Sequence, residues 1–207
     1  MRTSSPAPAT WIAALAFLFA WGCSEAPRQA PLPEIGAVPE FTLTERSGKT
    51  VSLAELRGAP WVANFIFTSC AGPCPRISSQ MAKLQKADAG PEGARFVSFT
   101  VDPETDTPAA LREYANSFGA SPERWLFLTG EKQQLYSLIR DGFKLAVDDG
   151  QGENAGGPPA GIITHSTRFV LVDAQARIRG YLDSAEPDFE EKALAGLKKL
   201  IAEAGKN

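Results

Sequence analysis

The sequence is poor in the residues that several kinds of function require. Its 207 residues include three cysteines, two methionines and a single histidine. Lys and Arg together number 21 against 24 Asp and Glu, so the net charge is −3 and the chain lacks the basic surface by which proteins bind nucleic acid. No heptad pattern, internal repeat or phosphate-binding glycine loop stands out. The fold must therefore be inferred from the order of the apolar runs, and the function from a few reactive side chains.

The N-terminal apolar run is too short to cross a membrane. It extends over 11 residues from Trp11 to Trp21, whereas a helix needs about 20 residues to span a hydrocarbon core of about 30 Å. This length is typical of a signal-peptide core. The Gly22–Cys23 junction resembles that of bacterial lipoproteins, in which the cysteine becomes the lipidated first residue. We expect residues 1–22 to be a signal peptide and Cys23 to be the lipid anchor, with an ordinary secretory signal as the alternative.

Both alternatives imply export, and the lipoprotein signal predicts a domain held at a membrane of the cell envelope, in the periplasm. Residues 26–40 are rich in proline and poor in core residues, which is typical of an extended tether. We assign residues 23–34 to the lipidated tether. Residues 35–207 then form one domain, long enough to bury a core of its own.

Cysteine usage indicates chemistry and not a structural framework. If Cys23 carries lipid, the exported domain keeps Cys70 and Cys74, which are four positions apart. A disulfide framework in a secreted protein would join more distant parts of the chain. A bridge between residues so close in sequence closes a very small loop, and small loops stabilise least in the chain-entropy view.

Apolar runs after the tether predict strands and helices in alternation. Continuous apolar runs are typical of strands buried on both faces, and capping residues or first-turn prolines mark helix starts. The predicted strands are two short ones within Phe41–Leu53, then Trp61–Phe67, Arg95–Val101, Trp125–Gly130, Ile163–Asp173 and Arg177–Asp183. The predicted helices are a short one after Ser52, one from Pro73 or Pro75, one after Thr107, then Glu131–Phe143 and Pro187–Ala204. A loop is predicted at Asp148–Gly161 and a hairpin turn at Ala174–Ala176.

This order predicts an α/β fold with a mainly parallel central sheet, closed by an antiparallel hairpin and flanked by helices. It is a thioredoxin-like arrangement. Cys70 and Cys74 follow the first central strand, Trp61–Phe67, and so lie at its carboxyl end, where α/β folds place ligands.

The spacing of Cys70 and Cys74 is compatible with a metal and with a disulfide. A helix N-terminus is expected to lower a thiol pKa, which favours both metal binding and thiol exchange. Cβ atoms four positions apart on a helix are about 5–6 Å apart, whereas a disulfide needs about 3.5–4.5 Å. A trigonal metal with bonds of about 2.3 Å would hold its sulfurs roughly 4 Å apart. The spacing favours a metal, but Cys70 on a loop could still approach Cys74.

His165 is a candidate third ligand. It opens the predicted strand Ile163–Asp173, just after the Gly- and Pro-rich loop. Two thiolates and one imidazole suit copper, because Cu(I) favours thiolates at low coordination number and Cu(II) accepts the same donors with an imidazole. Zinc would need a fourth ligand. The alternative is a surface or hydrogen-bonded histidine without a ligand role.

Three segments together resemble the Sco/SenC family of thioredoxin-fold copper proteins. They are FTSCAGPCP, VSFTVDPETDTP and THSTRFVLVD, in this order, and the similarity extends from about Ile35 to Ala202. The family assists assembly of the dinuclear copper centre of cytochrome c oxidase. The resemblance implies that Cys70, Cys74 and His165 are the copper ligands. It further implies that the copper-accepting oxidase subunit is the partner, with other periplasmic copper chaperones as further candidates.

One departure from the family pattern keeps a redox function in view. Family members commonly carry Pro after the first cysteine, where this chain has Ala71, and Gly72–Pro73 before Cys74 is more thioredoxin-like. Copper delivery is therefore the leading hypothesis, with a Cys70–Cys74 disulfide as the second state of the site. The alternative is a thiol–disulfide oxidoreductase that reduces the target's copper-ligand cysteines. A peroxide-reducing enzyme of the same fold is a weaker third hypothesis.

The remaining polar candidates are Asp102 and Asp106. Asp102 is interpreted either as the start of a turn before Pro103 or as a carboxylate near the metal that contacts a ligand or a partner. Asp106 precedes the N-capping Thr107. Methionine is too scarce for a thioether copper site, and with the one histidine assigned to the metal, no Ser–His–Asp triad is credible.

Overall fold

The computed structural model describes residues 30–88, 93–146 and 167–205. Cys23, His165 and the predicted loop at Asp148–Gly161 lie outside these ranges. Among the described residues, no helix combines the length and the apolar character needed to cross a membrane.

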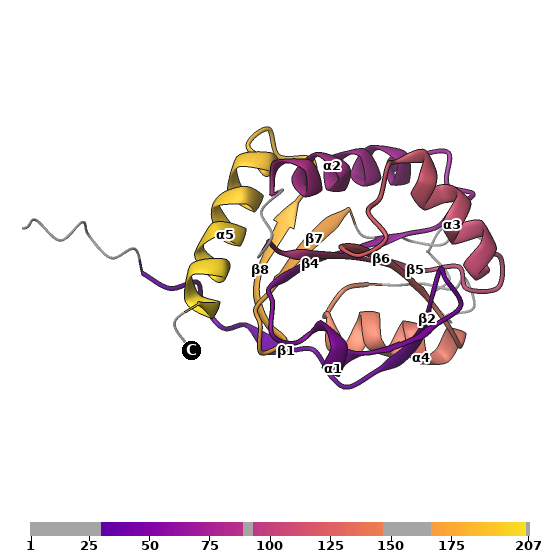
Figure 1. Ribbon diagram of the computed structural model, residues 1–207, viewed down its shortest axis with the longest axis horizontal. Coiled ribbons are helices and arrows are strands. Elements are labelled where there is room, and N and C mark those ends of the chain that lie inside the picture. Colours follow the sequence, from indigo (N-terminus) through magenta and orange to yellow (C-terminus); the bar gives the residue numbers. More distant parts are fainter. Residues whose placement is uncertain (1–29, 89–92, 147–166, 206–207) are drawn as a thin grey trace, which may run out of the picture. The chain divides into compact units, whose positions relative to one another are not determined.

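The described chain forms an eight-stranded sheet with helices on both faces (Figure 1). The strands lie in the order β1-β8-β7-β4-β5-β6-β2-β3. Their bounds are β1 Gly36–Ala37, β2 Thr42–Glu45, β3 Thr50–Ser52, β4 Trp61–Ile66, β5 Arg95–Thr100, β6 Trp125–Thr129, β7 Arg168–Val172 and β8 Arg177–Asp183. The helices are α1 Leu53–Leu56, α2 Pro73–Ala87, α3 Pro108–Ser117, α4 Lys132–Ser137, the π-helical turn η1 Leu138–Gly142 and α5 Phe189–Ala204.

The centre of the sheet is parallel and its flanks are antiparallel. β4 pairs with β5, and β5 with β6, in parallel. β7 runs antiparallel to β4, and β8 antiparallel to β7, as the predicted hairpin requires. On the other side β2 pairs antiparallel with β6 and with β3. The predicted alternation of strands and helices is confirmed. The sheet contains antiparallel pairs besides the predicted hairpin, because β2 also pairs in this way.

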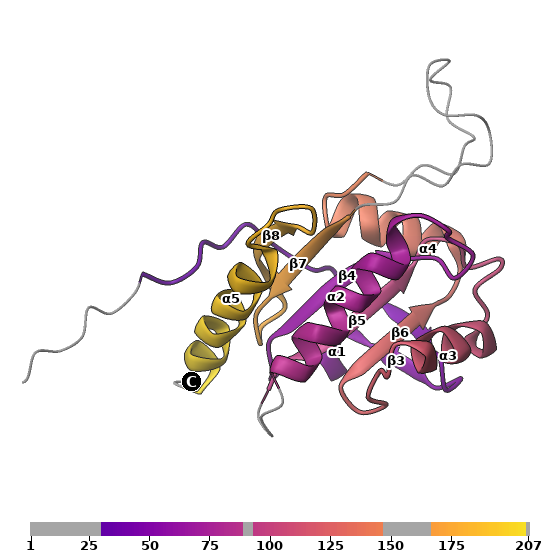
Figure 2. The same cartoon turned by 90° about the horizontal axis from the view of Figure 1, so that it is seen from above.

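β4 separates two apolar cores. All six of its residues are buried, and alternate side chains point to opposite faces of a strand. Val62 and Ile66 pack with α2, α3 and α5, whereas Trp61 and Phe65 pack with α1 and α4. Figure 2 shows α2 lying along the central strands on the first of these faces. A continuous apolar run therefore encodes a strand covered on both sides.

The N-terminal segment enters the sheet earlier than its proline content suggests. β1 lies within the proline-rich run of residues 26–40 and pairs with β8, and Val38 is buried. The buried Arg179 donates hydrogen bonds to the carbonyls of Leu32 and Pro33. The domain therefore has contacts that begin before residue 35, the start assigned from the sequence.

Candidate functional site

The two cysteines lie where β4 gives way to α2. β4 ends at Ile66, a short loop carries Cys70, and α2 begins at Pro73. Proline is favoured in this first turn because its missing N–H would have had no helical partner. Cys74 therefore lies in the first turn of α2, and Cys70 lies on the loop before it, as the sequence predicted.

Both thiols are free and close to each other. Cys70 is 8% exposed and Cys74 is fully buried, and neither forms a disulfide. A hydrogen bond joins the two thiols. The peptide groups of Phe67 contact both cysteines, because its carbonyl accepts the Cys70 N–H at 3.3 Å and its N–H donates to the Cys74 sulfur. The loop thus brings Cys70 to Cys74. Of the two residues, Cys70 alone is accessible to solvent.

Burial controls the electrostatics of this pair. It raises the pKa of Cys74 to about 12, and the Phe67 N–H lowers it only in part. The hydrogen bond that the Cys74 thiol donates to Cys70, and the negative charges of Cys70 and Asp106, raise the pKa of Cys74 further. The prediction that a helix N-terminus lowers the thiol pKa is therefore wrong for Cys74. The partial charge of a helix end is worth about 0.3–1 kcal/mol at most positions, and removing water from a thiolate costs more.

Asp106 is the carboxylate that reaches the cysteine loop. It is fully buried, and it accepts hydrogen bonds from the hydroxyls of Thr68 and Thr100 at 2.6 and 2.5 Å. The Thr68 N–H donates to both of its oxygens, at 3.1 and 3.2 Å. Burial raises the pKa of Asp106, and these hydrogen bonds oppose the shift. The contact of Asp106 with the loop was not predicted from the sequence. The polar residues Thr68 and Thr100 at two adjacent strand ends were the available signal.

Asp102 occupies the turn that its sequence context predicts. Its carbonyl accepts the N–H groups of Thr105 and Asp106 at 3.2 and 2.8 Å, and its N–H donates to the Thr100 hydroxyl at 2.9 Å. Its backbone therefore shapes the loop that carries Asp106. A direct role for the Asp102 carboxylate near a metal stays a prediction.

A tyrosine from α3 hydrogen-bonds the helix that carries Cys74. The Tyr114 hydroxyl hydrogen-bonds Ser78 of α2 at 2.9 Å. Burial raises the pKa of Tyr114 to about 12, and the negative potential of Cys74 and Cys70 adds to the shift. Tyr114 lies at helical spacing from Leu111 and Phe118 in the sequence, and that spacing alone gives no sign of this polar contact.

The donors present suit a soft metal. Thiolates favour Cu(I), Zn and iron–sulfur clusters, and Cys70 and Cys74 offer two neighbouring donors of this kind. Within residues 30–88, 93–146 and 167–205, no group of three Cys, His, Asp or Glu side chains could hold a metal ion. Since His165 lies outside these ranges, its role as third ligand stays a prediction.

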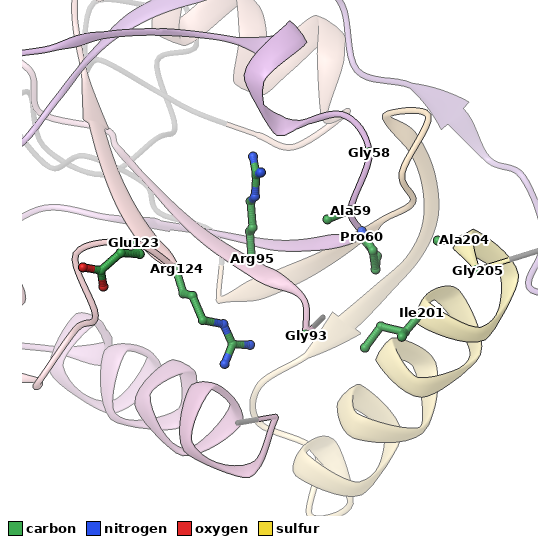
Figure 3. A pocket seen from close by; sticks show the side chains of 10 residues that line it. All are labelled: Gly58, Ala59, Pro60, Gly93, Arg95, Glu123, Arg124, Ile201, Ala204 and Gly205. Atoms are coloured by element: carbon green, nitrogen blue, oxygen red, sulfur yellow. The ribbon is translucent and has the colours of Figure 1, made fainter. Parts of the chain in front are cut away.

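A surface pocket of about 410 Å³ lies away from the thiols (Figure 3). It is lined by residues near the start of β4 and β5 and the end of α5. These lie at the end of the strands opposite the cysteines. Its cationic side chains are already engaged: Arg124 hydrogen-bonds Asp88 at 2.7 Å and the Ala94 carbonyl at 2.8 Å, and Arg95 hydrogen-bonds the Glu55 carbonyl. This pocket is therefore separate from the cysteine loop.

A parallel-centred α/β sheet with a dithiol at the start of the helix after its first central strand defines a thioredoxin-like protein. The model of the SCO1/SenC family matches residues 30–202. The chain is 35% identical over 168 residues to a SCO1 protein homolog of Bacillus subtilis strain 168, covering 80% of this chain and 82% of the relative. The chain therefore belongs to the SCO1/SenC family.

Solved structures agree with this assignment. A SCO1/SenC family lipoprotein from Bacillus anthracis superposes with a TM-score of 0.73 at 30% identity, covering 83% of this chain and 99% of that one. BsSco, described as a member of the Sco family of cytochrome c oxidase assembly proteins with a disulfide switch, gives 0.71 at 29% identity, covering 84% and 99%. Bradyrhizobium japonicum ScoI with copper bound gives 0.62 at 24% identity, covering 79% and 99%, and shares the fold. The predicted thioredoxin-like fold is confirmed.

Proposed function

We propose that this protein is a copper metallochaperone that delivers copper to the dinuclear copper centre of a respiratory cytochrome c oxidase. The observation that carries the proposal is the free, mutually hydrogen-bonded pair Cys70 and Cys74 at the carboxyl end of β4. Family membership supports it, since the relative BsSco is described as a member of a family of oxidase assembly proteins.

Copper is the cargo in this proposal, bound by Cys70, Cys74 and His165 as Cu(I) or Cu(II). The pair suits transfer because Cys74 is fully buried and Cys70 is 8% exposed. The buried sulfur holds the ion from within the protein, and the partner's ligands can approach from the side of Cys70. The partner we infer is the copper-accepting subunit of the oxidase, and other periplasmic copper chaperones are candidate donors.

A second candidate is thiol–disulfide exchange with the target's copper-ligand cysteines. The hydrogen-bonded thiols favour it, because they are already close enough to interact directly. The description of BsSco as containing a disulfide switch also supports it. In such an exchange the target disulfide gains two electrons and two protons, and Cys70 and Cys74 lose them as their own disulfide forms. Cys70 is the attacking thiol because it is the more accessible one.

The variant His165→Ala separates the two functions. Imidazole completes a trigonal copper site but forms no bond in an exchange between thiols. We expect copper affinity to fall by orders of magnitude, measured by titrating the reduced protein and recording thiolate-to-copper charge-transfer absorption. Oxidase assembly should then fail, as it should also in the double variant Cys70→Ser/Cys74→Ser. Normal assembly with His165→Ala, at normal protein levels and without added copper, would favour the reductase.

We further propose that the protein is exported and lipid-anchored through Cys23, with its domain in the periplasm. The B. anthracis relative is named a lipoprotein, and Gly22–Cys23 resembles a lipoprotein junction. The variant Cys23→Ala should accumulate as unprocessed precursor, visible as a larger band on a gel. Normal processing of that variant would contradict lipidation and favour an ordinary secretory signal.

A further inference from the structure

Asp106 links the cysteine loop after β4 to the end of β5, two segments that are distant in sequence. Its carboxylate accepts the Thr100 hydroxyl at the end of β5, and the hydroxyl and N–H of Thr68 on the cysteine loop. Its own N–H donates to the Asp102 carbonyl at 2.8 Å, which fixes the loop that carries it. Both carboxylate oxygens are thus engaged, in a fully buried position where unpaired polar groups are costly.

The hydrogen bonds continue from Thr68 to both thiols. Thr68 follows Phe67 directly, so holding the Thr68 N–H also fixes the peptide plane that contains the Phe67 carbonyl. That carbonyl accepts the Cys70 N–H at 3.3 Å. The preceding peptide donates the Phe67 N–H to the Cys74 sulfur. Asp106 therefore lies at the base of a hydrogen-bonded chain that ends at Cys70 and Cys74.

We propose that Asp106 is a positioning residue for the dithiol site. Its carboxylate oxygens hold Thr68, and through Thr68 and Phe67 they set the arrangement of Cys70 and Cys74 that binds the ligand. The inference rests on the proposed copper function for its ligand, but the arrangement of the thiols can be measured without copper. The role depends on a hydrogen-bond acceptor at this point and not on its negative charge.

A comparison of Asp106→Ala with Asp106→Asn shows whether the site needs the hydrogen-bond acceptor or the negative charge of Asp106. The asparagine keeps an oxygen for Thr68, whereas alanine removes it, and both variants remove the charge. We expect Asp106→Ala to weaken copper binding by about 10–100-fold, the range typical for loss of a group that orients metal ligands. Asp106→Asn should keep the copper affinity within about threefold of the unchanged protein. This loss is far smaller than the one expected for Asp106→Ala.

The copper-free measurement is the alkylation of each thiol, followed by mass spectrometry. In the unchanged protein Cys70 should react first, because Cys74 is fully buried. Asp106→Ala should raise the alkylation rate of Cys74 by about tenfold or more, since local opening then exposes it. Thr68→Val, which removes the hydroxyl and keeps the side-chain shape, should change both measurements in the same direction. It keeps the inference testable even if Asp106→Ala does not fold.

Asp173→Asn is the matched control. Asp173 is also a buried carboxylate with several hydrogen-bond donors, Arg177 and Arg179 among them. It follows β7 at the edge of the sheet opposite the cysteines. This variant should lower the resistance to urea while leaving copper affinity and Cys74 protection unchanged in native buffer.

The outcomes separate this inference from the proposed function. Failure of the unchanged protein to bind copper would refute the copper proposal, and the alkylation rates would then decide the role of Asp106. If Asp106→Ala matches the unchanged protein or Asp173→Asn in both measurements, Asp106 does not position the thiols. If Asp106→Asn is as impaired as Asp106→Ala, the charge and not the acceptor is required, and the inference is overturned.

Discussion

The buried thiol of Cys74 predicts a steep pH dependence of copper binding. A metal binds the thiolate, so the Cys74 proton must leave when copper enters. Burial raises the pKa of this thiol to about 12. At pH 7 the thiolate therefore makes up only about one part in 10⁵ of the copper-free protein, and almost every binding event releases this proton.

The release of this proton determines the direction and the size of the change in copper affinity with pH. Because the pKa of Cys74 lies far above neutral pH, each unit of rising pH makes its deprotonation tenfold easier, or about 1.4 kcal/mol. Cys74 alone should then raise the apparent copper affinity about 100-fold between pH 6 and pH 8. A thiol whose pKa had been lowered below 6 by the helix N-terminus would contribute no increase over this range.

The assay is a copper competition titration against a chelator of known proton affinity, repeated from pH 6 to pH 8. The logarithm of the affinity should rise with pH without a plateau attributable to Cys74. The matched control is Cys74→Ser, in which the slope should fall by about one unit per pH unit because one released proton is lost. An unchanged slope in Cys74→Ser, or a flat profile in the unchanged protein, would refute the reasoning from burial.

Two further variants test the packing of the domain. Arg179→Met should lower the free energy of unfolding in urea by about 1–3 kcal/mol, because it removes one of the two arginines that pair with the buried Asp173. The Arg179 side chain is 6% exposed and pairs with Asp173 at 2.9 Å. A change near zero would show that the ion pair is dispensable. Gly196→Ala should destabilise by about 1–3 kcal/mol through overpacking, less about 1 kcal/mol of gained helix propensity, since a Cβ at Gly196 would lie 2.5 Å from Cδ1 of Leu171. The loss should shrink in a Leu171→Val background, which lacks that methyl; equal losses in both backgrounds would contradict the clash.

Local sequence rules predicted the elements of the fold accurately. Trp61–Ile66 is an unbroken apolar run and forms a strand buried on both faces. Ser52 and Glu55 form a capping box at the predicted start of α1, with the Ser52 N–H donating to Glu55 at 2.9 Å. The Thr107 side chain caps α3 by accepting the Ala110 N–H at 3.2 Å. Each of these features depends on residues a few positions apart, which the sequence displays directly.

Features that depend on distant residues were not predictable in this way. Asp106 contacts Thr68 across 38 positions, and no local pattern identifies that partner. β1 has two residues and therefore no periodicity, and its pairing with β8 creates it. The pKa of Cys74 was predicted from its helix position, but burial by the surrounding fold decides it. The cysteines themselves were found because their reactivity and spacing are local.

The chain enters the domain through β1, at the opposite end of the strands from the cysteine loop. Gly36 pairs with Ile178, which pairs with Val172, and Val172 pairs with Trp61, the first residue of β4. Cys70 follows the last residue of that same strand. The chain therefore joins the domain at the end of the sheet that lies away from the thiols. Immobilisation through the N-terminus should leave the dithiol free to meet a partner in solution.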